Sequence, residues 1–97
     1  MACKSLEEVR NNIDRIDKEI IMLIAERGNF VKHASKFKKD SQDVTAPQRV
    51  EAVIQKVRQL SEEYGANPDM VEKLYRDMIA NFVRIEMNEF NNNNRFV

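Results

Sequence analysis

The chain has 97 residues, in which 16 basic side chains balance 16 acidic ones, and it is 33% charged and 42% hydrophobic. This length allows one domain, residues 1–97, and the apolar content is too high for a disordered chain. The balanced charge gives no reason to expect nucleic acid or an anionic membrane as a partner. No stretch approaches the roughly 20 apolar residues of a membrane span, and the first residues lack the apolar segment of a signal peptide. We therefore expect a cytoplasmic protein.

The residue types that carry most metal and nucleophilic chemistry are scarce. A single cysteine, Cys3, and a single histidine, His33, exclude an internal disulfide, a cysteine-based zinc cluster and the common His-rich catalytic metal sites. His33 falls on the polar face of its helix, where we interpret it as solvated, and we expect no role for Cys3. Because Gly-rich phosphate loops and nucleophile motifs are also missing from the sequence, we expect neither a metal nor a cofactor.

The first predicted element is a long helix over about residues 6–38. Ser5, followed three residues later by Glu8, is the capping-box pattern of a helix start. Apolar residues then recur at helical spacing from Val9 to Ala34. The lone Gly28 costs a helix about 1 kcal/mol, which a pattern of this length absorbs.

A second helix is predicted after a polar loop, Lys39–Val44. Thr45, with Gln48 three residues later and Pro47 in the first turn, has the pattern of a helix start. An apolar stripe follows at helical spacing, and Gly65 is the expected end of the helix.

A third helix is predicted from Asn67 and Pro68 to near Phe90, with apolar residues on one broad face. The polar residues 91–97 are interpreted as a flexible tail, which leaves about residues 6–90 ordered. The fold class is therefore all-α, with three helices per chain.

The length of the first helix predicts how the chain assembles. A helix of about 33 residues is about 50 Å long, whereas a compact monomer of this size is little over about 30 Å across. The apolar stripe would then overhang its own globule, so we expect a partner chain to cover it in an intertwined homodimer. The alternative is a first helix bent or broken at Gly28 in a monomeric three-helix bundle.

Several charged residues lie where core residues are expected. Arg27 falls in the middle of the apolar stripe of the first helix, Lys38 continues that stripe, and Arg10 lies at its edge. Arg49 lies at the margin of the second stripe, and Glu86 on the flank of the third. Four inward cations against one carboxylate indicate a pocket for a ligand with more than one negative charge. The alternative is structural: an ion pair such as Lys38 with Glu86, or buried aliphatic stems with their charges in water.

These positions carry a resemblance to a known family. The segments Leu6-Glu7-Glu8-Val9-Arg10, Ile13-Asp14-Arg15-Ile16-Asp17 and Ala25-Glu26-Arg27, then Lys38, a polar loop and Arg49, resemble the all-helical (type II) chorismate mutases over about residues 6–90. The resemblance implies an intertwined dimer of three-helix chains with two active sites. It also implies a dianionic substrate, chorismate, which rearranges to prephenate in the shikimate pathway of aromatic amino acid biosynthesis.

The expected site residues are Lys38 and Glu86 as catalytic groups and, as substrate-binding groups, Arg10, Arg27, Arg49 and Val83. By resemblance, Arg10 reaches into the site of the other subunit, while Arg27 and Arg49 bind substrate carboxylates within their own. Lys38 would hydrogen-bond the ether oxygen and a carboxylate. Glu86 stands where bacterial members usually have Gln, also facing the ether oxygen, so it can donate only when protonated.

One departure favours a different reaction. Val50 stands where many chorismate mutases place a Glu that binds the ring hydroxyl. The segment Ala46-Pro47-Gln48-Arg49-Val50, together with Ala34-Ser35-Lys36-Phe37-Lys38, is similar to the isochorismate pyruvate lyase branch. That branch eliminates pyruvate from isochorismate in salicylate biosynthesis. We therefore expect a chorismate mutase first and an isochorismate pyruvate lyase as the alternative. A non-catalytic helical dimer that binds an aromatic-pathway metabolite or a partner enzyme is a third reading.

Overall fold

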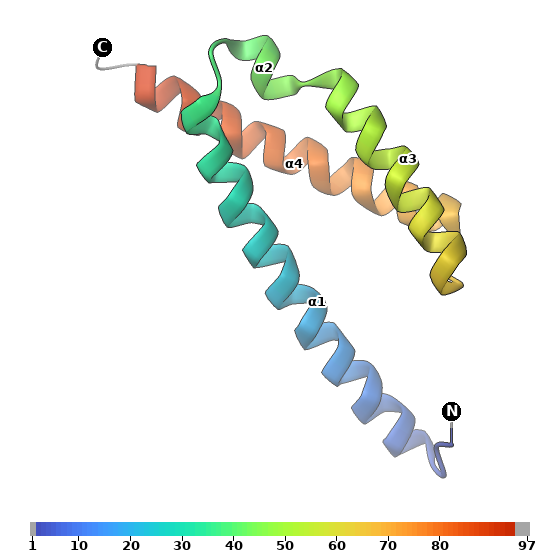
Figure 1. The fold of residues 1–97 in the computed structure, drawn as a ribbon. Helices are drawn as coiled ribbons and strands as arrows, with labels where there is room; N and C mark the ends of the chain where they lie inside the picture. The colour runs from blue at the N-terminus through green and yellow to red at the C-terminus, as the bar shows by residue number, and fades with distance from the viewer. Residues whose placement is uncertain (1, 95–97) are drawn as a thin grey trace. The chain divides into compact units, whose positions relative to one another are not determined.

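The computed structural model describes residues 2–94, which form four α-helices and one 3-10 helix (Figure 1). In chain order these are α1 (Leu6–Ala34), η1 (Ser35–Phe37), α2 (Ser41–Thr45), α3 (Pro47–Tyr64) and α4 (Pro68–Asn94). The described residues contain no strand, so the predicted all-α class is confirmed. Within residues 2–94, no helix combines sufficient length and apolarity to span a bilayer.

The chain divides into two compact units, one ending at Phe30 and the other beginning at Val31. The first unit consists mainly of α1, whose start follows the predicted capping pattern. The Glu8 N–H donates to Ser5 Oγ at 3.1 Å, and the Glu8 carboxylate accepts the Lys4 N–H at 3.0 Å. The helix continues through Gly28 without a break.

The apolar stripe of α1 is exposed among the described residues 2–94. The helix has no buried residue, and Ile13 and Ile20 expose 49% and 46% of their surfaces. The other large apolar residues exposed on this stripe are Leu6, Val9, Ile16, Leu23 and Ile24. Exposed apolar surface of this extent is typical of an interface, so the intertwined dimer stays our prediction.

The second unit has its core between α3 and α4, which lie side by side in Figure 1, with α2 and η1 also packed on α4. Its buried apolar residues are Val44, Ile54 and Val57. Ile54 and Val57 lie one turn apart on α3, as the predicted apolar stripe requires. The core is small, and it places η1 and α2 against the same helix.

Three predicted boundaries differ from the structure. Helix α1 ends at Ala34 rather than near Lys38, because Ser35–Phe37 tighten into a 3-10 turn and Lys38 is extended. The predicted loop 39–44 instead contains most of α2, since Val44, 2% exposed, gives this polar segment a buried anchor. Helix α4 continues to Asn94 rather than ending near Phe90, because each added residue of a formed helix gains a main-chain hydrogen bond.

The predicted start of the second helix is also partly wrong. Thr45 does not cap α3, because its hydroxyl donates to the Gln42 carbonyl at 3.1 Å and it ends α2. Ala46 is the N-cap residue of α3, and Pro47 occupies the first turn as predicted. Of the predicted tail, residues 95–97 lie outside the described part of the chain.

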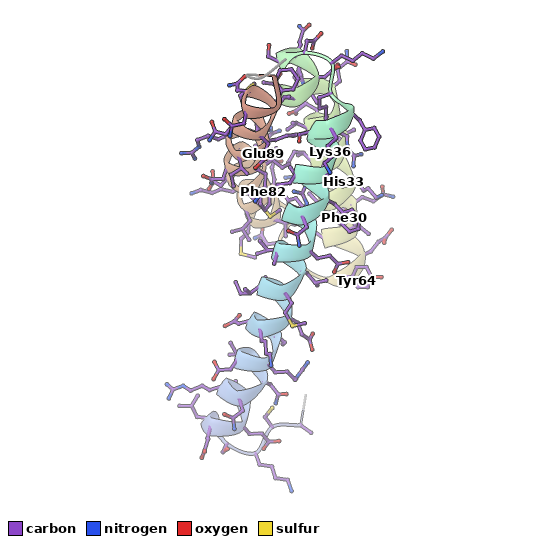
Figure 2. The ribbon with its side chains drawn as sticks, turned by 90° about the vertical axis from the view of Figure 1, so that its left-hand side faces the viewer. Phe30, His33, Lys36, Tyr64, Phe82 and Glu89 are labelled. Atoms are coloured by element: carbon purple, nitrogen blue, oxygen red, sulfur yellow. The ribbon has the colours of Figure 1, made fainter. Side chains whose placement is uncertain are left out.

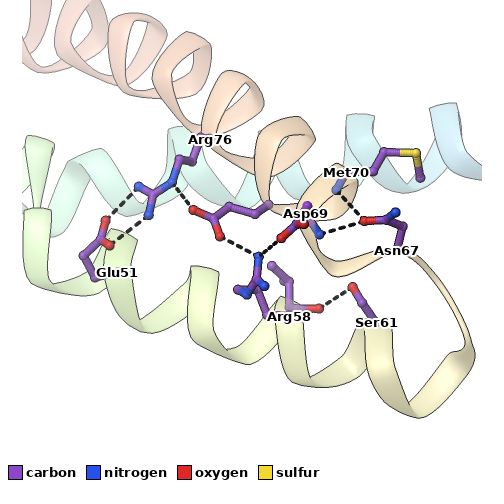
Figure 3. A network of polar contacts seen from close by, with 9 residues as sticks. Glu51, Arg58, Ser61, Asn67, Asp69, Met70 and Arg76 are labelled. Atoms are coloured by element: carbon purple, nitrogen blue, oxygen red, sulfur yellow. Dashed lines mark hydrogen bonds and ion pairs between the residues drawn. The ribbon is translucent and has the colours of Figure 1, made fainter.

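An ion-pair network joins α3 to α4 on the surface (Figure 3). Arg76 binds both carboxylate oxygens of Glu51 at 2.8 and 2.9 Å and also contacts Glu72 at 2.8 Å. Arg58 contacts Asp69 at 3.0 Å and Glu72 at 2.8 Å. The hydrogen bonds from Arg76 hold the pKa values of Glu51 and Glu72 below the ordinary range of a Glu carboxyl. Networks with bidentate geometry contribute more to stability than isolated surface pairs.

We therefore expect Arg76→Met to lower the free energy of unfolding more than Arg15→Met, which removes the isolated Arg15–Glu19 pair of α1. Because the pKa values of Glu51 and Glu72 are lowered in the folded state, their contribution is present above the ordinary Glu pKa and is lost as the pH falls. Urea unfolding at one protein concentration, at neutral and at acid pH, measures this difference. Equal losses in the two variants at neutral pH would contradict the expectation.

Candidate active site

A cation and a buried carboxylate meet where the chain leaves η1 and passes α4. Glu86 of α4 is only 5% exposed, and the Lys38 Nζ lies 3.9 Å from its Oε2. This distance is an ion pair but exceeds hydrogen-bond length. Within residues 2–94, no hydrogen-bond partner reaches Glu86 Oε2. A buried polar atom without a partner inside the chain is available to a ligand.

The environment of Glu86 also changes its acidity. Burial raises the pKa of the Glu86 carboxyl above its ordinary value, and the positive charge of Lys38 opposes this with a smaller effect. The protonated form of Glu86 is therefore favoured relative to a solvated Glu. A protonated carboxyl is a hydrogen-bond donor, which an ionised one is not.

The Lys38 ammonium has a second, shorter contact. It donates to the main-chain carbonyl of Asp43 in α2 at 2.9 Å, while the Lys38 side chain is partly buried. One of its three N–H donors is therefore occupied, and the ammonium is held at a defined place between α2 and α4.

A pocket of about 710 Å³ opens beside Lys38. It is lined by Ala34, Phe37, Lys38, Gln42, Asp43, Ala46, Pro47, Gln48 and Arg49. Two of the predicted cations, Lys38 and Arg49, thus share one pocket, although Lys38 precedes α2 and Arg49 belongs to α3. Its volume lies within the range of about 300–1,000 Å³ that is usual for small-molecule sites.

The remaining predicted site residues belong to α1 and α4. Val83 is partly buried on α4, one turn before Glu86. Arg10, which is exposed, and Arg27, which is partly buried, both belong to the first unit. That Arg10 and Arg27 join Lys38 in one site stays a prediction.

The sequence did not indicate all the residues that line the pocket, but it predicted the exposure of the nearby His33 correctly. Gln42 and Gln48 line the pocket, but amide residues did not stand out from the helical pattern, whereas Phe37, 75% exposed, belongs to the segment similar to the lyase branch. His33 (Figure 2) is exposed, as predicted, and its ring centroid lies 5.8 Å from that of Phe37. The part of the chain from residue 2 to 94 holds no cluster of His, Cys, Asp or Glu suited to a metal ion.

Sequence comparison identifies the family. The profile of the type II chorismate mutases matches residues 9–87, which is most of the chain. The chain belongs to the type II chorismate mutase family. The predicted resemblance is thereby confirmed, and the family is one of enzymes.

Relatives within this family carry different names. An isochorismate pyruvate lyase of Pseudomonas aeruginosa is 36% identical over 77 residues, covering 79% of this chain and 76% of that protein. A chorismate mutase of Methanocaldococcus jannaschii is 29% identical over 77 residues, covering 78% of each chain. A bifunctional chorismate mutase/prephenate dehydratase of Aquifex aeolicus is 31% identical over 87 residues, and this chain spans only 24% of its length. The comparisons therefore support both of the reactions expected from the sequence.

Proposed function

We propose that this family member is a chorismate mutase that rearranges chorismate to prephenate. The observation that carries the proposal is the Lys38 ammonium, which lines the pocket with Arg49 and lies 3.9 Å from a buried Glu86. The rearrangement is pericyclic, so it needs no nucleophile, metal or cofactor. It needs the reactive conformer of the substrate to be held and the negative charge on its ether oxygen to be stabilised.

The proposed roles divide between binding and charge stabilisation. Arg49 binds a carboxylate of the dianion at the mouth of the pocket. Arg27 also binds a substrate carboxylate, in the site of its own subunit. Lys38 donates to the ether oxygen and to a carboxylate. Glu86, when protonated, donates to the same ether oxygen, and Val83 provides an apolar wall beside it. A millionfold acceleration corresponds to about 8 kcal/mol, which fixed hydrogen-bond donors and cations can supply.

The proposed enzyme is a homodimer that works in the cytoplasm as one domain. The exposed apolar stripe of α1 supports the dimer, since a second copy of α1 offers the matching surface. Arg10 then contributes to the site of the other subunit. A single cysteine is compatible with a reducing compartment.

An isochorismate pyruvate lyase is the second candidate. The Pseudomonas aeruginosa relative named for this activity favours it, as does Val50 on α3, which offers no carboxylate to a ring hydroxyl. The same cations would bind isochorismate and stabilise the departing enolpyruvyl oxygen, leaving salicylate and pyruvate.

Supplying the purified protein with chorismate and isochorismate separately distinguishes the candidates. Prephenate from chorismate, at a higher kcat/KM than salicylate from isochorismate, is the expected result. The reverse ranking would assign the chain to the lyase branch. Formation of neither product would refute both activities and favour the metabolite-binding dimer.

The raised pKa of Glu86 leads to a pH-dependent rate. We expect kcat to fall as the pH rises through the Glu86 pKa, because the ionised carboxylate cannot donate to the ether oxygen. In Glu86→Gln the amide donates at every pH, so the profile of this variant should be flat where that of the wild type declines. Steady-state rates between about pH 5 and 8 measure this.

The same group makes a matching prediction for stability. Because the Glu86 pKa is raised in the folded state, the folded protein retains a proton that the unfolded chain releases, and stability falls as the pH rises above the ordinary Glu pKa. Glu86→Gln should remove this part of the pH dependence. A wild-type rate profile that is flat and unaltered in Glu86→Gln would contradict the assigned role.

A further inference from the structure

The contact between Lys38 and Asp43 depends on a main-chain carbonyl that α2 leaves open. In a continuing α-helix the Asp43 carbonyl would accept the N–H of the residue four positions later. That residue is Pro47, which has no N–H to donate. The carbonyl instead accepts the Lys38 ammonium at 2.9 Å. The sequence thus provides an acceptor for Lys38 at a fixed place in the fold.

The carbonyl before Asp43 is already paired. The Ala46 N–H donates to the Gln42 carbonyl at 2.9 Å, so the acceptor that precedes Asp43 is already used. Ala46 itself adopts a left-handed conformation with φ 37°, which residues with a Cβ rarely take. Strained backbone of this kind persists where surrounding contacts impose it and is common at functional sites.

The N–H and the carboxylate of Asp43 are held by hydrogen bonds, and the following residue is held by packing. The Asp43 N–H donates to Asp40 Oδ1 at 2.9 Å, which caps α2, and Asp43 Oδ2 accepts the Lys39 N–H at 3.0 Å. Val44, the next residue, is buried and anchors α2 against α4, which carries Glu86. The position of the Asp43 carbonyl relative to Glu86 is therefore determined by α2.

We propose that Asp40 is a positioning residue for Lys38. Asp40 accepts the Asp43 N–H and thereby holds the turn of α2. The Asp43 carbonyl, held in this turn, keeps the Lys38 ammonium beside Glu86 and the pocket. Asp40 is not among the residues that line the pocket, and it acts through the Asp43 peptide. The kinetic consequence of this role rests on the proposed function, whereas its effect on the geometry around Glu86 does not.

The kinetic test compares Asp40→Ala, Asp40→Asn and Asn67→Ala. Asp40→Ala removes the cap of α2, and we expect kcat to fall about fivefold because the Lys38 ammonium loses its fixed place, while KM changes less than about twofold. Asp40→Asn retains an acceptor oxygen and should recover most of the rate. Asn67 is the matched control, since its Oδ1 caps α4 by accepting the Asp69 and Met70 N–H groups, far from Lys38 in sequence. Asn67→Ala should leave kcat as it is.

A titration of the Glu86 carboxyl, followed by its ¹³C chemical shift, tests the same role without turnover. Burial raises the Glu86 pKa, and the positive charge of Lys38, which lies 3.9 Å away, offsets part of this rise. In Asp40→Ala the ammonium loses its fixed place, so the Glu86 pKa should rise above its wild-type value, whereas in Asp40→Asn and Asn67→Ala it should stay unchanged.

The kinetic test and the Glu86 titration distinguish failure of the proposed function from failure of the proposed role of Asp40. If the wild type turns over neither acid, the proposed function fails and the titration alone decides the role of Asp40. An unchanged Glu86 pKa in Asp40→Ala overturns the proposal, whatever the rates. A rate loss in Asn67→Ala equal to that in Asp40→Ala also overturns it, because the effect would then be general loss of helix stability.

Discussion

Replacing Lys38 by alanine is expected to lower kcat/KM at least about 100-fold, the usual cost of removing one donor to a developing oxyanion, while the chain stays folded. The variant loses the only cation that the structure places both at the pocket and beside Glu86 within residues 2–94. Folding should survive, because burial already favours the neutral form of Glu86, which can take up a proton when its ion-pair partner is removed.

Lys36→Ala is the matched control for this change. Lys36 lies two residues earlier, is exposed on η1 (Figure 2) and lies outside the pocket lining, so its removal should leave kcat/KM within about twofold. Initial rates with the preferred acid, together with circular dichroism of each variant, are the measurements. Near-wild-type turnover in Lys38→Ala would refute the site assignment.

Ile20→Lys is expected to abolish the dimer and, with it, almost all activity. Ile20 lies on the exposed apolar stripe of α1, where a second chain would bury it, and an unpaired ammonium is costly in such an interface. Because Arg10 is proposed to serve the site of the other subunit, a monomer lacks one of its substrate-binding cations. Loss of one such charged contact typically costs a binding site a factor of ten or more.

Met22→Lys introduces the same side chain on the opposite side of α1. Met22 is likewise an exposed large apolar residue, but at helical spacing it lies outside the stripe that Ile20 shares with Ile13, Ile16 and Ile24. The Met22→Lys substitution should leave both dimer assembly and turnover unchanged. Sedimentation equilibrium with rate measurements at the same protein concentrations tests the pair. A wild-type protein that sediments as a monomer while retaining full activity would refute the dimer and the role of Arg10 together.

The helices were predictable because their signals are local. The capping pattern at Ser5 and Glu8 and the 3.6-residue spacing of apolar residues depend only on neighbours in the chain, so α1 begins as expected and continues through Gly28. Short elements lack such a pattern. Helix α2 has five residues, and it forms because Val44 is buried against α4 and Asp40 caps the turn, which periodicity over so few residues cannot indicate.

The candidate site was predictable in part. Lys38, Arg49 and Glu86 stood out because each interrupts or flanks an apolar stripe. In the structure Lys38 lines the same pocket as Arg49 and forms an ion pair with Glu86. The acceptor on Asp43 was not predicted, because a main-chain carbonyl leaves no mark in a hydrophobic pattern. Pro47, four residues later, was the one available signal, and it was interpreted only as a helix start.

By itself the sequence determined the helical class and the family, because these follow from residue type and spacing along the chain. Spacing did not determine which cations are buried, since Arg10 and Arg49, both expected to face inward, are exposed in the structure. The tertiary structure alone decided that Lys38 is tied to α2 while facing Glu86 on α4, and that burial raises the Glu86 pKa. Distances and desolvation depend on which helices pack together, and residues 48 positions apart become neighbours only when the second unit folds.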